Sequence, residues 1–65
     1  MLTLDKLSRT PIYEQIINNV RREISAGTIA EQSQLPSVRE LSAFLGVNPN
    51  TVQRAYNELR MRGYI

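Results

Sequence analysis

Hydrophobic residues recur every three or four positions in three segments of the chain, the spacing that places them on one face of an α-helix. The first segment is preceded by Thr10-Pro11, a hydroxyl N-cap followed by proline at the first helical position. Gly27 then provides a stop signal, so the sequence predicts a helix over residues 11–26. Its hydrophobic face consists of Ile12, Tyr13, Ile16, Ile17, Val20 and Ile24.

The second segment begins with Ser37, which caps the helix while Glu40 reaches back from the third position, the pattern of a capping box. Gly46 ends this helix, which is predicted over residues 37–45. Its inner face consists of Val38, Leu41 and Leu45, with Ser42 as a small neighbour.

The third segment follows almost at once. Asn48 is the predicted N-cap, Pro49 takes the first helical position, and Val47 can pack against Val52 as a hydrophobic staple. Gly63 closes a helix predicted over residues 49–62, after which an extended segment begins. The inner face consists of Val52, Ala55, Tyr56 and Leu59.

The remaining residues give weaker signals. Leu2, Leu4 and Leu7 alternate within residues 1–9, which form either a strand-like arm or a loose end. Ile29 is the centre of a weak strand signal between the first two helices. The predicted organisation is an N-terminal arm over residues 1–9 and one mainly α domain over residues 10–65.

The turn between the second and third helices, residues 45–48, indicates a DNA-binding function. Two helices joined by such a short glycine-containing turn form a helix-turn-helix, in which the second helix lies in the major groove of DNA. Asparagine and glutamine side chains pair with adenine, and arginine pairs with guanine. The candidate base-reading residues at the start of the third helix are Asn48, Asn50, Thr51, Gln53 and Arg54. A polar solvent-exposed face without any ligand is the alternative.

Two residues of the second helix join this candidate site. Ser37 is a cap, and the helix N-terminus that it opens is also suited to a phosphate group. Arg39, on the first turn, contacts either DNA or a nearby carboxylate. Tyr56 is expected in the core, and Phe44 falls outside the inner face, at the domain edge or against a partner surface.

Composition narrows the class of protein. The 65 residues make one small domain, and the absence of cysteine and histidine excludes disulfides and the usual zinc ligands. Eight basic and six acidic residues give a net charge of +2, with three arginines near the C-terminus against one glutamate. No apolar run approaches the roughly 20 residues of a membrane span. We expect a cytoplasmic protein that is not an enzyme and needs no cofactor or metal.

Four motifs stand at a characteristic joint spacing. They are Pro11-Ile12-Tyr13-Glu14-Gln15-Ile16, Leu35-Pro36-Ser37-Val38-Arg39-Glu40-Leu41, Leu45-Gly46-Val47-Asn48-Pro49-Asn50-Thr51-Val52, and Ala55-Tyr56-Asn57-Glu58-Leu59 followed by Gly63-Tyr64-Ile65. Together they resemble the GntR family of winged helix-turn-helix regulators. The first motif and the Asn-Pro-Asn-Thr run are most similar to its YtrA-type branch.

The resemblance implies a bacterial transcription regulator, usually a repressor, that binds a palindromic DNA operator as a homodimer. It implies DNA contacts at Arg39, Asn48, Asn50, Thr51, Gln53 and Arg54, and a phosphate contact at Ser37. The implied fold is a three-helix winged helix-turn-helix whose wing hairpin is truncated after its first residues. The effector that such a regulator would bind is unknown.

The sequence departs from the family pattern at two points, and two alternative functions accompany the main interpretation. Gln32 stands where the family usually has glycine, and the family's wing and C-terminal region are missing beyond Ile65. One alternative is the DNA-binding head of a regulator that carries an aminotransferase-like domain, as in the MocR-type branch. The other is a winged helix used only for protein contacts, with Phe44 in the contact patch.

Overall fold

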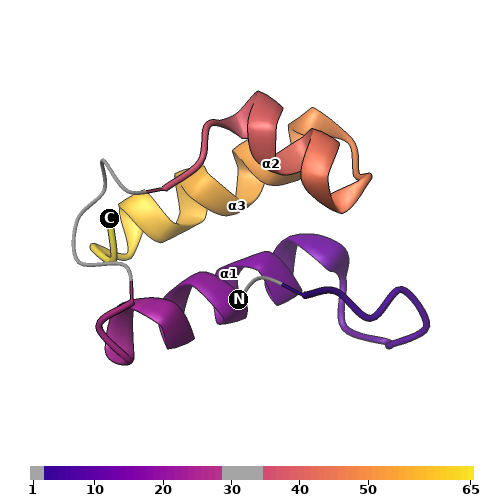
Figure 1. Ribbon diagram of the computed structural model, residues 1–65. Coiled ribbons are helices and arrows are strands. Elements are labelled where there is room, and N and C mark those ends of the chain that lie inside the picture. The colour runs from indigo at the N-terminus through magenta and orange to yellow at the C-terminus, as the bar shows by residue number, and fades with distance from the viewer. Residues whose placement is uncertain (1–2, 29–34) are drawn as a thin grey trace.

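The structure, a computed structural model, describes residues 3–28 and 35–65 of the chain. Three helices occur in this part and no strand: α1 (Ile12–Ser25), α2 (Val38–Leu45) and α3 (Pro49–Met61). Their ends lie within one residue of the predicted ends. α3 packs against both α1 and α2, which do not pack against each other (Figure 1). The mainly α helix-turn-helix fold is therefore confirmed, and α3 is its central element.

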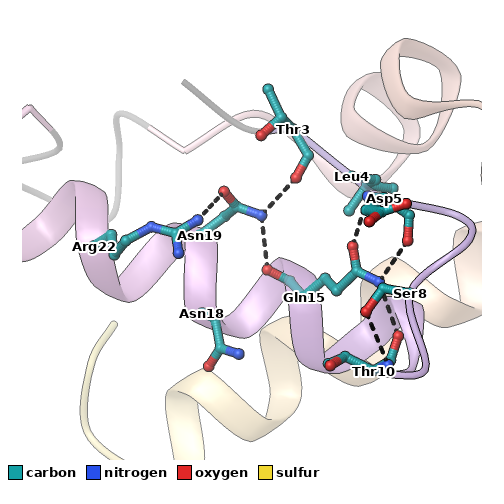
Figure 2. Close-up of a pocket in the computed structure, with 9 residues that line it drawn as sticks. All are labelled: Thr3, Leu4, Asp5, Ser8, Thr10, Gln15, Asn18, Asn19 and Arg22. Carbon is teal, nitrogen blue, oxygen red and sulfur yellow. Dashed lines mark hydrogen bonds between the residues drawn. The ribbon is translucent and has the colours of Figure 1, made fainter.

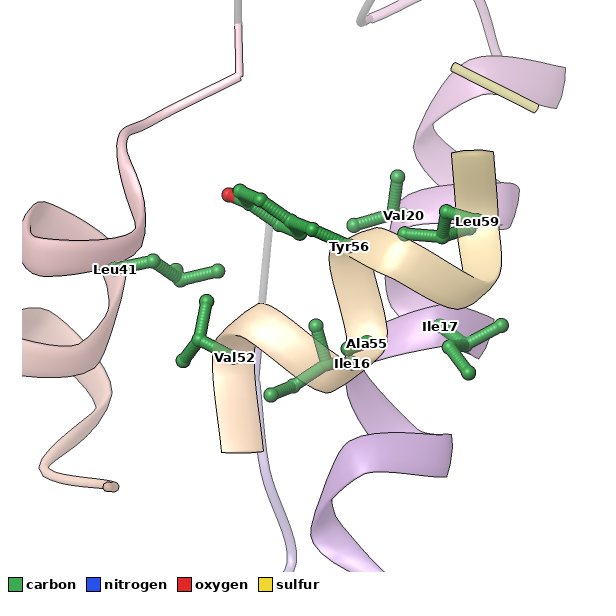
Figure 3. Packing of buried hydrophobic residues seen from close by; sticks show 8 residues of the cluster. All are labelled: Ile16, Ile17, Val20, Leu41, Val52, Ala55, Tyr56 and Leu59. Carbon is green, nitrogen blue, oxygen red and sulfur yellow. The ribbon is translucent and has the colours of Figure 1, made fainter. Parts of the chain in front are cut away.

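The hydrophobic core lies between α1 and α3, and one side chain reaches into it from α2 (Figure 3). All four inner-face residues predicted for α3 are buried, including Tyr56, which is 5% exposed. On α1, Ile12, Tyr13 and Ile24 are only partly buried because they lie at the edges of the stripe. The buried core consists of Ile16, Ile17, Val20, Leu41, Val52, Ala55, Tyr56 and Leu59.

The capping signals of α2 and α3 are confirmed. The Ser37 Oγ accepts a hydrogen bond from the Glu40 backbone N–H at 3.0 Å, and the Ser37 N–H donates to Glu40 Oε1 at 3.1 Å. Asn48 caps α3 by accepting from the Asn50 N–H at 2.8 Å, and Pro49 is the first helical residue. Gly46 ends α2 in the left-handed conformation, with φ of 68°. These local signals fix the geometry of the turn between the two helices.

Ser37→Ala should lower the free energy of unfolding by about 0.5–2 kcal/mol, because it leaves an N–H group of the first turn without its partner. α2 has only eight residues, so few of its other backbone bonds can compensate. Urea denaturation measures the change. Ser25→Ala, at the exposed end of α1, is the matched control and should change stability by less than about 0.5 kcal/mol. Equal effects of the two substitutions would show that the Ser37 cap does not contribute to the stability of the fold.

The predicted start of α1 is wrong in its detail. Pro11 is the N-cap and lies before the helix, and no side chain caps this end. The Thr10 hydroxyl has no capping role; the Thr10 carbonyl instead accepts a hydrogen bond from Gln15 Nε2 at 2.8 Å. The Gln15 side chain, one turn into the helix, thus folds back over the helix N-terminus.

The described part of the N-terminal arm is neither a strand nor a loose end. Gln15 exchanges two hydrogen bonds with the backbone of Asp5, at 2.8 and 2.9 Å. Asn19, which is 5% exposed, donates to the carbonyls of Thr3 and Gln15 (Figure 2). Leu7 is 96% exposed, so the alternation of leucines does not mark a buried strand face. Two amides of α1 therefore hold the arm by its backbone.

The weak strand signal at Ile29 and the departure at Gln32 lie outside the described residues. Across the described ranges, none of the helices combines the length and the apolar character that crossing a bilayer requires.

Candidate nucleic-acid interface

The first turn of α3 presents polar groups and no acidic residue. Asn48 and Asn50 are exposed, and Thr51 is partly buried. The capping bond engages the Asn48 side-chain oxygen and leaves its amide nitrogen available to a ligand. The backbone N–H groups at this end also carry the positive pole of the helix dipole. This end of α3 is therefore suited to contact a negatively charged, hydrogen-bonding surface.

Arg54 lies one turn further along α3 and has an unexpected partner. Its side chain is exposed, as expected, but its guanidinium carbon lies 3.7 Å from the centre of the Tyr13 ring of α1. The two side chains line one shallow hollow together with Ile12, Asn50 and Thr51. The structure thus brings Asn50, Thr51 and Arg54 together and adds Tyr13 to them. Sequence reasoning missed Tyr13 as a neighbour of the site because no local spacing relates two residues on different helices.

Gln53 faces the other side of α3. Its Nε2 donates to Asn57 Oδ1 at 2.9 Å, and Arg60 donates to the same oxygen at 3.4 Å. Gln53 lines a second hollow together with Ser37, between α3 and the start of α2. The candidate residues therefore form two groups, one on each side of the N-terminal half of α3.

Ser37 is exposed, and its hydroxyl is engaged in the capping box. The hydrogen bonds from Ser37 hold the pKa of the Glu40 carboxyl below its ordinary value. A lowered pKa means that this stabilisation is present above the ordinary carboxyl pKa and is lost as the pH falls through the lowered value. The N–H groups of Val38 and Arg39 have no acceptor within α2, because they belong to its first turn. Those two donors are the ones that this helix end offers to an anion.

Arg39 is exposed on the first turn of α2. Among the described residues its side chain has no carboxylate partner, in contrast to Arg62, which pairs with Glu58 at 3.0 Å near the end of α3. The carboxylate alternative for Arg39 is therefore not realised in the described part of the chain. Within the described residues, no hydrogen bond, ion pair or ring contact joins the Arg39 side chain to the other candidate residues.

Tyr56 has a structural role, as expected. Its hydroxyl donates to the Pro36 carbonyl at 2.7 Å, which ties α3 to the segment that leads into α2. Burial and, secondarily, the negative charge of Glu40 raise the pKa of Tyr56 to about 12. The hydroxyl thus stays protonated as a donor throughout the physiological range.

A bracing helix, a glycine turn and a second helix with an exposed, amide-rich start define a helix-turn-helix domain. The chain belongs to the GntR family of bacterial regulatory proteins, whose sequence model matches residues 12–65. The function expected from the sequence, DNA binding in transcription regulation, agrees with this membership.

Similar proteins support the assignment. The transcriptional repressor YtrA of Bacillus subtilis is 46% identical over 65 residues, which are all of this chain and 50% of that protein. The regulatory protein MocR of Rhizobium meliloti is 37% identical over 65 residues, which are 13% of its length. The solved structure of YtrA from Sulfolobus acidocaldarius superposes with a TM-score of 0.92 at 44% identity, covering 98% of this chain and 68% of that one. The chain therefore spans half or less of the length of these two bacterial relatives.

Proposed function

We propose that this chain binds double-stranded DNA with α3 in the major groove, as part of a transcription regulator that acts as a repressor. The observation that carries the proposal is the capped start of α3, where exposed amides and Arg54 adjoin one another without an acidic neighbour in the first turn. The amides suit adenine and the guanidinium suits guanine. The repressor role is supported by the relative from Bacillus subtilis, which is named a repressor.

In this proposal the candidate residues of α3 and those of α2 have different tasks. Asn48, Asn50, Thr51 and Arg54 read base edges, and Gln53 joins them when it exchanges its bond to Asn57 for a base. Ser37 and Arg39 contact the DNA backbone from the start of α2. Contacts of this second kind position the protein without reading the sequence.

The chain further fits a regulator that acts in the bacterial cytoplasm, as a homodimer on a palindromic operator, without catalysis of its own. A single helix-turn-helix reads one half-site, and two-fold symmetry of the protein matches a palindrome in the DNA. All the named relatives are regulators.

Arg39→Ala and Arg54→Ala should weaken binding while leaving the fold intact. Arg54→Ala, which removes a proposed bidentate contact to guanine, should cost about 1–3 kcal/mol of binding free energy and relax the sequence preference at one base pair. Arg39→Ala, which removes a proposed backbone contact, should lose affinity about equally on every duplex. We would obtain the preferred duplex by selection from a randomised pool and by footprinting the DNA upstream of the protein's own gene. Fluorescence anisotropy titrations then give the affinities.

The matched control is Arg62→Ala, which removes the same charge at the far end of α3 from a residue already paired with Glu58. It should leave the sequence preference intact. An equal loss on every duplex would assign Arg54 to phosphate contacts alone, and a relaxed preference at one base pair for Arg39→Ala would assign Arg39 to a base contact. Unchanged affinity would place that arginine outside the interface.

A second candidate is the DNA-binding head of a much longer regulator, such as one with an aminotransferase-like domain. The observation in its favour is that the chain aligns with only 13% of YhdI from Bacillus subtilis, at 45% identity, and with 13% of MocR. The sequence of the gene downstream of Ile65 separates the two candidates, because a cofactor-binding lysine in a domain of several hundred residues would favour the longer form.

A third candidate, a module for protein contacts, draws on Phe44, whose side chain is 69% exposed on α2. For this candidate, Phe44 must be essential for binding a protein partner, and the polar residues of α3 must be dispensable for it. In the same DNA titration, the first proposal expects Asn50→Ala to lower the affinity and Phe44→Ala to leave it unchanged, whereas the third candidate expects the unmodified protein to bind no duplex.

A further inference from the structure

We propose that Tyr13 is a positioning residue for DNA recognition: its ring holds the Arg54 guanidinium at the place from which that group reads a base. The inference rests on the proposed function. It assigns to α1, which a helix-turn-helix uses for its core, a part in setting the sequence preference of α3.

The packing of the two helices keeps the stack in place. Tyr13 is in the first turn of α1 and is partly buried, so its ring has little freedom to rotate away. One turn later, Ile16 and Ile17 enter the same core as Val52 and Ala55, which flank Arg54 on α3. The core thus brings the backbones of Tyr13 and Arg54 close enough for the guanidinium and the ring to lie 3.7 Å apart.

Stacking does not use the groups that recognition needs. A guanidinium stacks through its flat face, whereas its five N–H donors lie in the plane and point outwards. No hydrogen bond or ion pair within the described ranges engages the Arg54 side chain. The stacked group therefore keeps its fork of donors free for a guanine or a phosphate.

The stack also reduces the cost of ordering a long side chain. A free arginine loses much rotamer freedom when it binds, and a group held beforehand in the bound orientation loses less. The hollow that Tyr13 and Arg54 line also includes Asn50 and Thr51, so the guanidinium is held beside the proposed base-reading residues. Removing the ring should consequently reduce both affinity and preference at one base pair.

The test compares Tyr13→Phe, which keeps the ring, with Tyr13→Leu, which keeps apolar volume without an aromatic face. Each variant binds the same randomised duplex pool, and the bound fraction is sequenced. We expect Tyr13→Leu to lose about two- to tenfold in affinity for the preferred duplex, the range for immobilising one long side chain on binding. Its lost preference should fall at the base pair where Arg54→Ala loses preference, and Tyr13→Phe should behave as the unmodified protein.

A second pair of the same kind is the matched control. Arg21 lies over the Tyr64 ring at 4.8 Å, between α1 and the segment after α3. Tyr64→Leu should leave the DNA preference unchanged. Adding Arg54→Ala to Tyr13→Leu should cause no loss beyond that of Arg54→Ala alone, because the ring acts through the guanidinium.

A measurement without DNA separates this inference from the proposed function. The ring should displace the NMR signals of the Arg54 δ-methylene protons in the unmodified protein and in Tyr13→Phe, and Tyr13→Leu should abolish the displacement. Absence of the displacement overturns the inference. The inference is also overturned if Tyr13→Phe and Tyr13→Leu show the same DNA sequence preference. If the unmodified protein binds no duplex from the pool, the proposed function fails and the recognition role of Tyr13 fails with it.

Discussion

Leu41→Ala should lower the free energy of unfolding by about 2–5 kcal/mol, the range for truncating a buried leucine to alanine. Leu41 is 2% exposed and is the one fully buried large side chain that α2 contributes to the core. α2 packs against α3 and not against α1, and Leu41 is the buried side chain by which it reaches the core (Figure 3). The expected loss is comparable with the whole stability of a small domain, which starts at about 5 kcal/mol.

Thermal and urea denaturation measure the loss, and Phe44→Ala on the same helix is the control. Phe44 is 69% exposed, so its truncation should change stability by no more than about 0.5 kcal/mol. Leu41→Ala should also weaken DNA binding, because a detached α2 no longer braces α3. If Leu41→Ala had the same melting temperature as the unmodified protein, this would contradict the packing of Leu41 between α2 and α3.

Local signals predicted most of the fold. Ser37 and Asn48 cap their helices through hydrogen bonds to residues two or three positions away, so the signal and the structure occupy the same few residues. The face of α3 that includes Val52 and Leu59 is buried as its spacing predicted, because a short helix has only one way to cover such a stripe. Gly46 adopts a positive φ at the end of α2 for the same local reason.

Contacts between distant residues could not be predicted in this way. The amide of Gln15 bonds to the backbone of Asp5 and Thr10, and Asn19 bonds to Thr3 from a buried position. Their spacing along the chain gives no sign of these bonds. They depend on where the arm returns after its turn, which only the assembled fold determines.

In the candidate site too, local features could be predicted from the sequence and contacts between distant residues could not. The exposure of Asn50 and Arg54 followed from helical periodicity. The stack of Arg54 on Tyr13 depended on the packing of α1 against α3, and so did not follow from it. Which of these residues contact DNA remains a prediction, and the substitutions described above test it.

Joining two copies of this domain should raise its affinity for a DNA with two half-sites by about 10²–10⁴, because the second contact becomes effectively intramolecular. A dimeric coiled coil fused after Ile65 provides the joint. Asn48 and Asn50 lie at the start of α3, about 20 Å along the helix from its C-terminal end (Figure 1). Ile65, however, lines the same hollow as Ser37 and Gln53. A flexible linker between Ile65 and the coiled coil therefore keeps the added helices away from these two residues.

The measurement is a series of anisotropy titrations at increasing salt, on duplexes with one half-site or with two. The half-sites are spaced by one helical turn of DNA, about 34–36 Å, or by multiples of that turn. The 65 residues alone should sediment as a monomer and bind DNA weakly, with a steep dependence on salt because phosphate contacts dominate.

The control is the same fusion with a proline in the coiled coil, which keeps the added mass and abolishes dimerisation. The gain should appear only for the dimeric fusion on the duplex with two half-sites, and only at the spacing that both copies can span. A bare domain that already sediments as a stable dimer and binds tightly at physiological salt would place the dimer contacts within these residues. A fusion that binds one and two half-sites equally would instead exclude a palindromic operator read by two such heads.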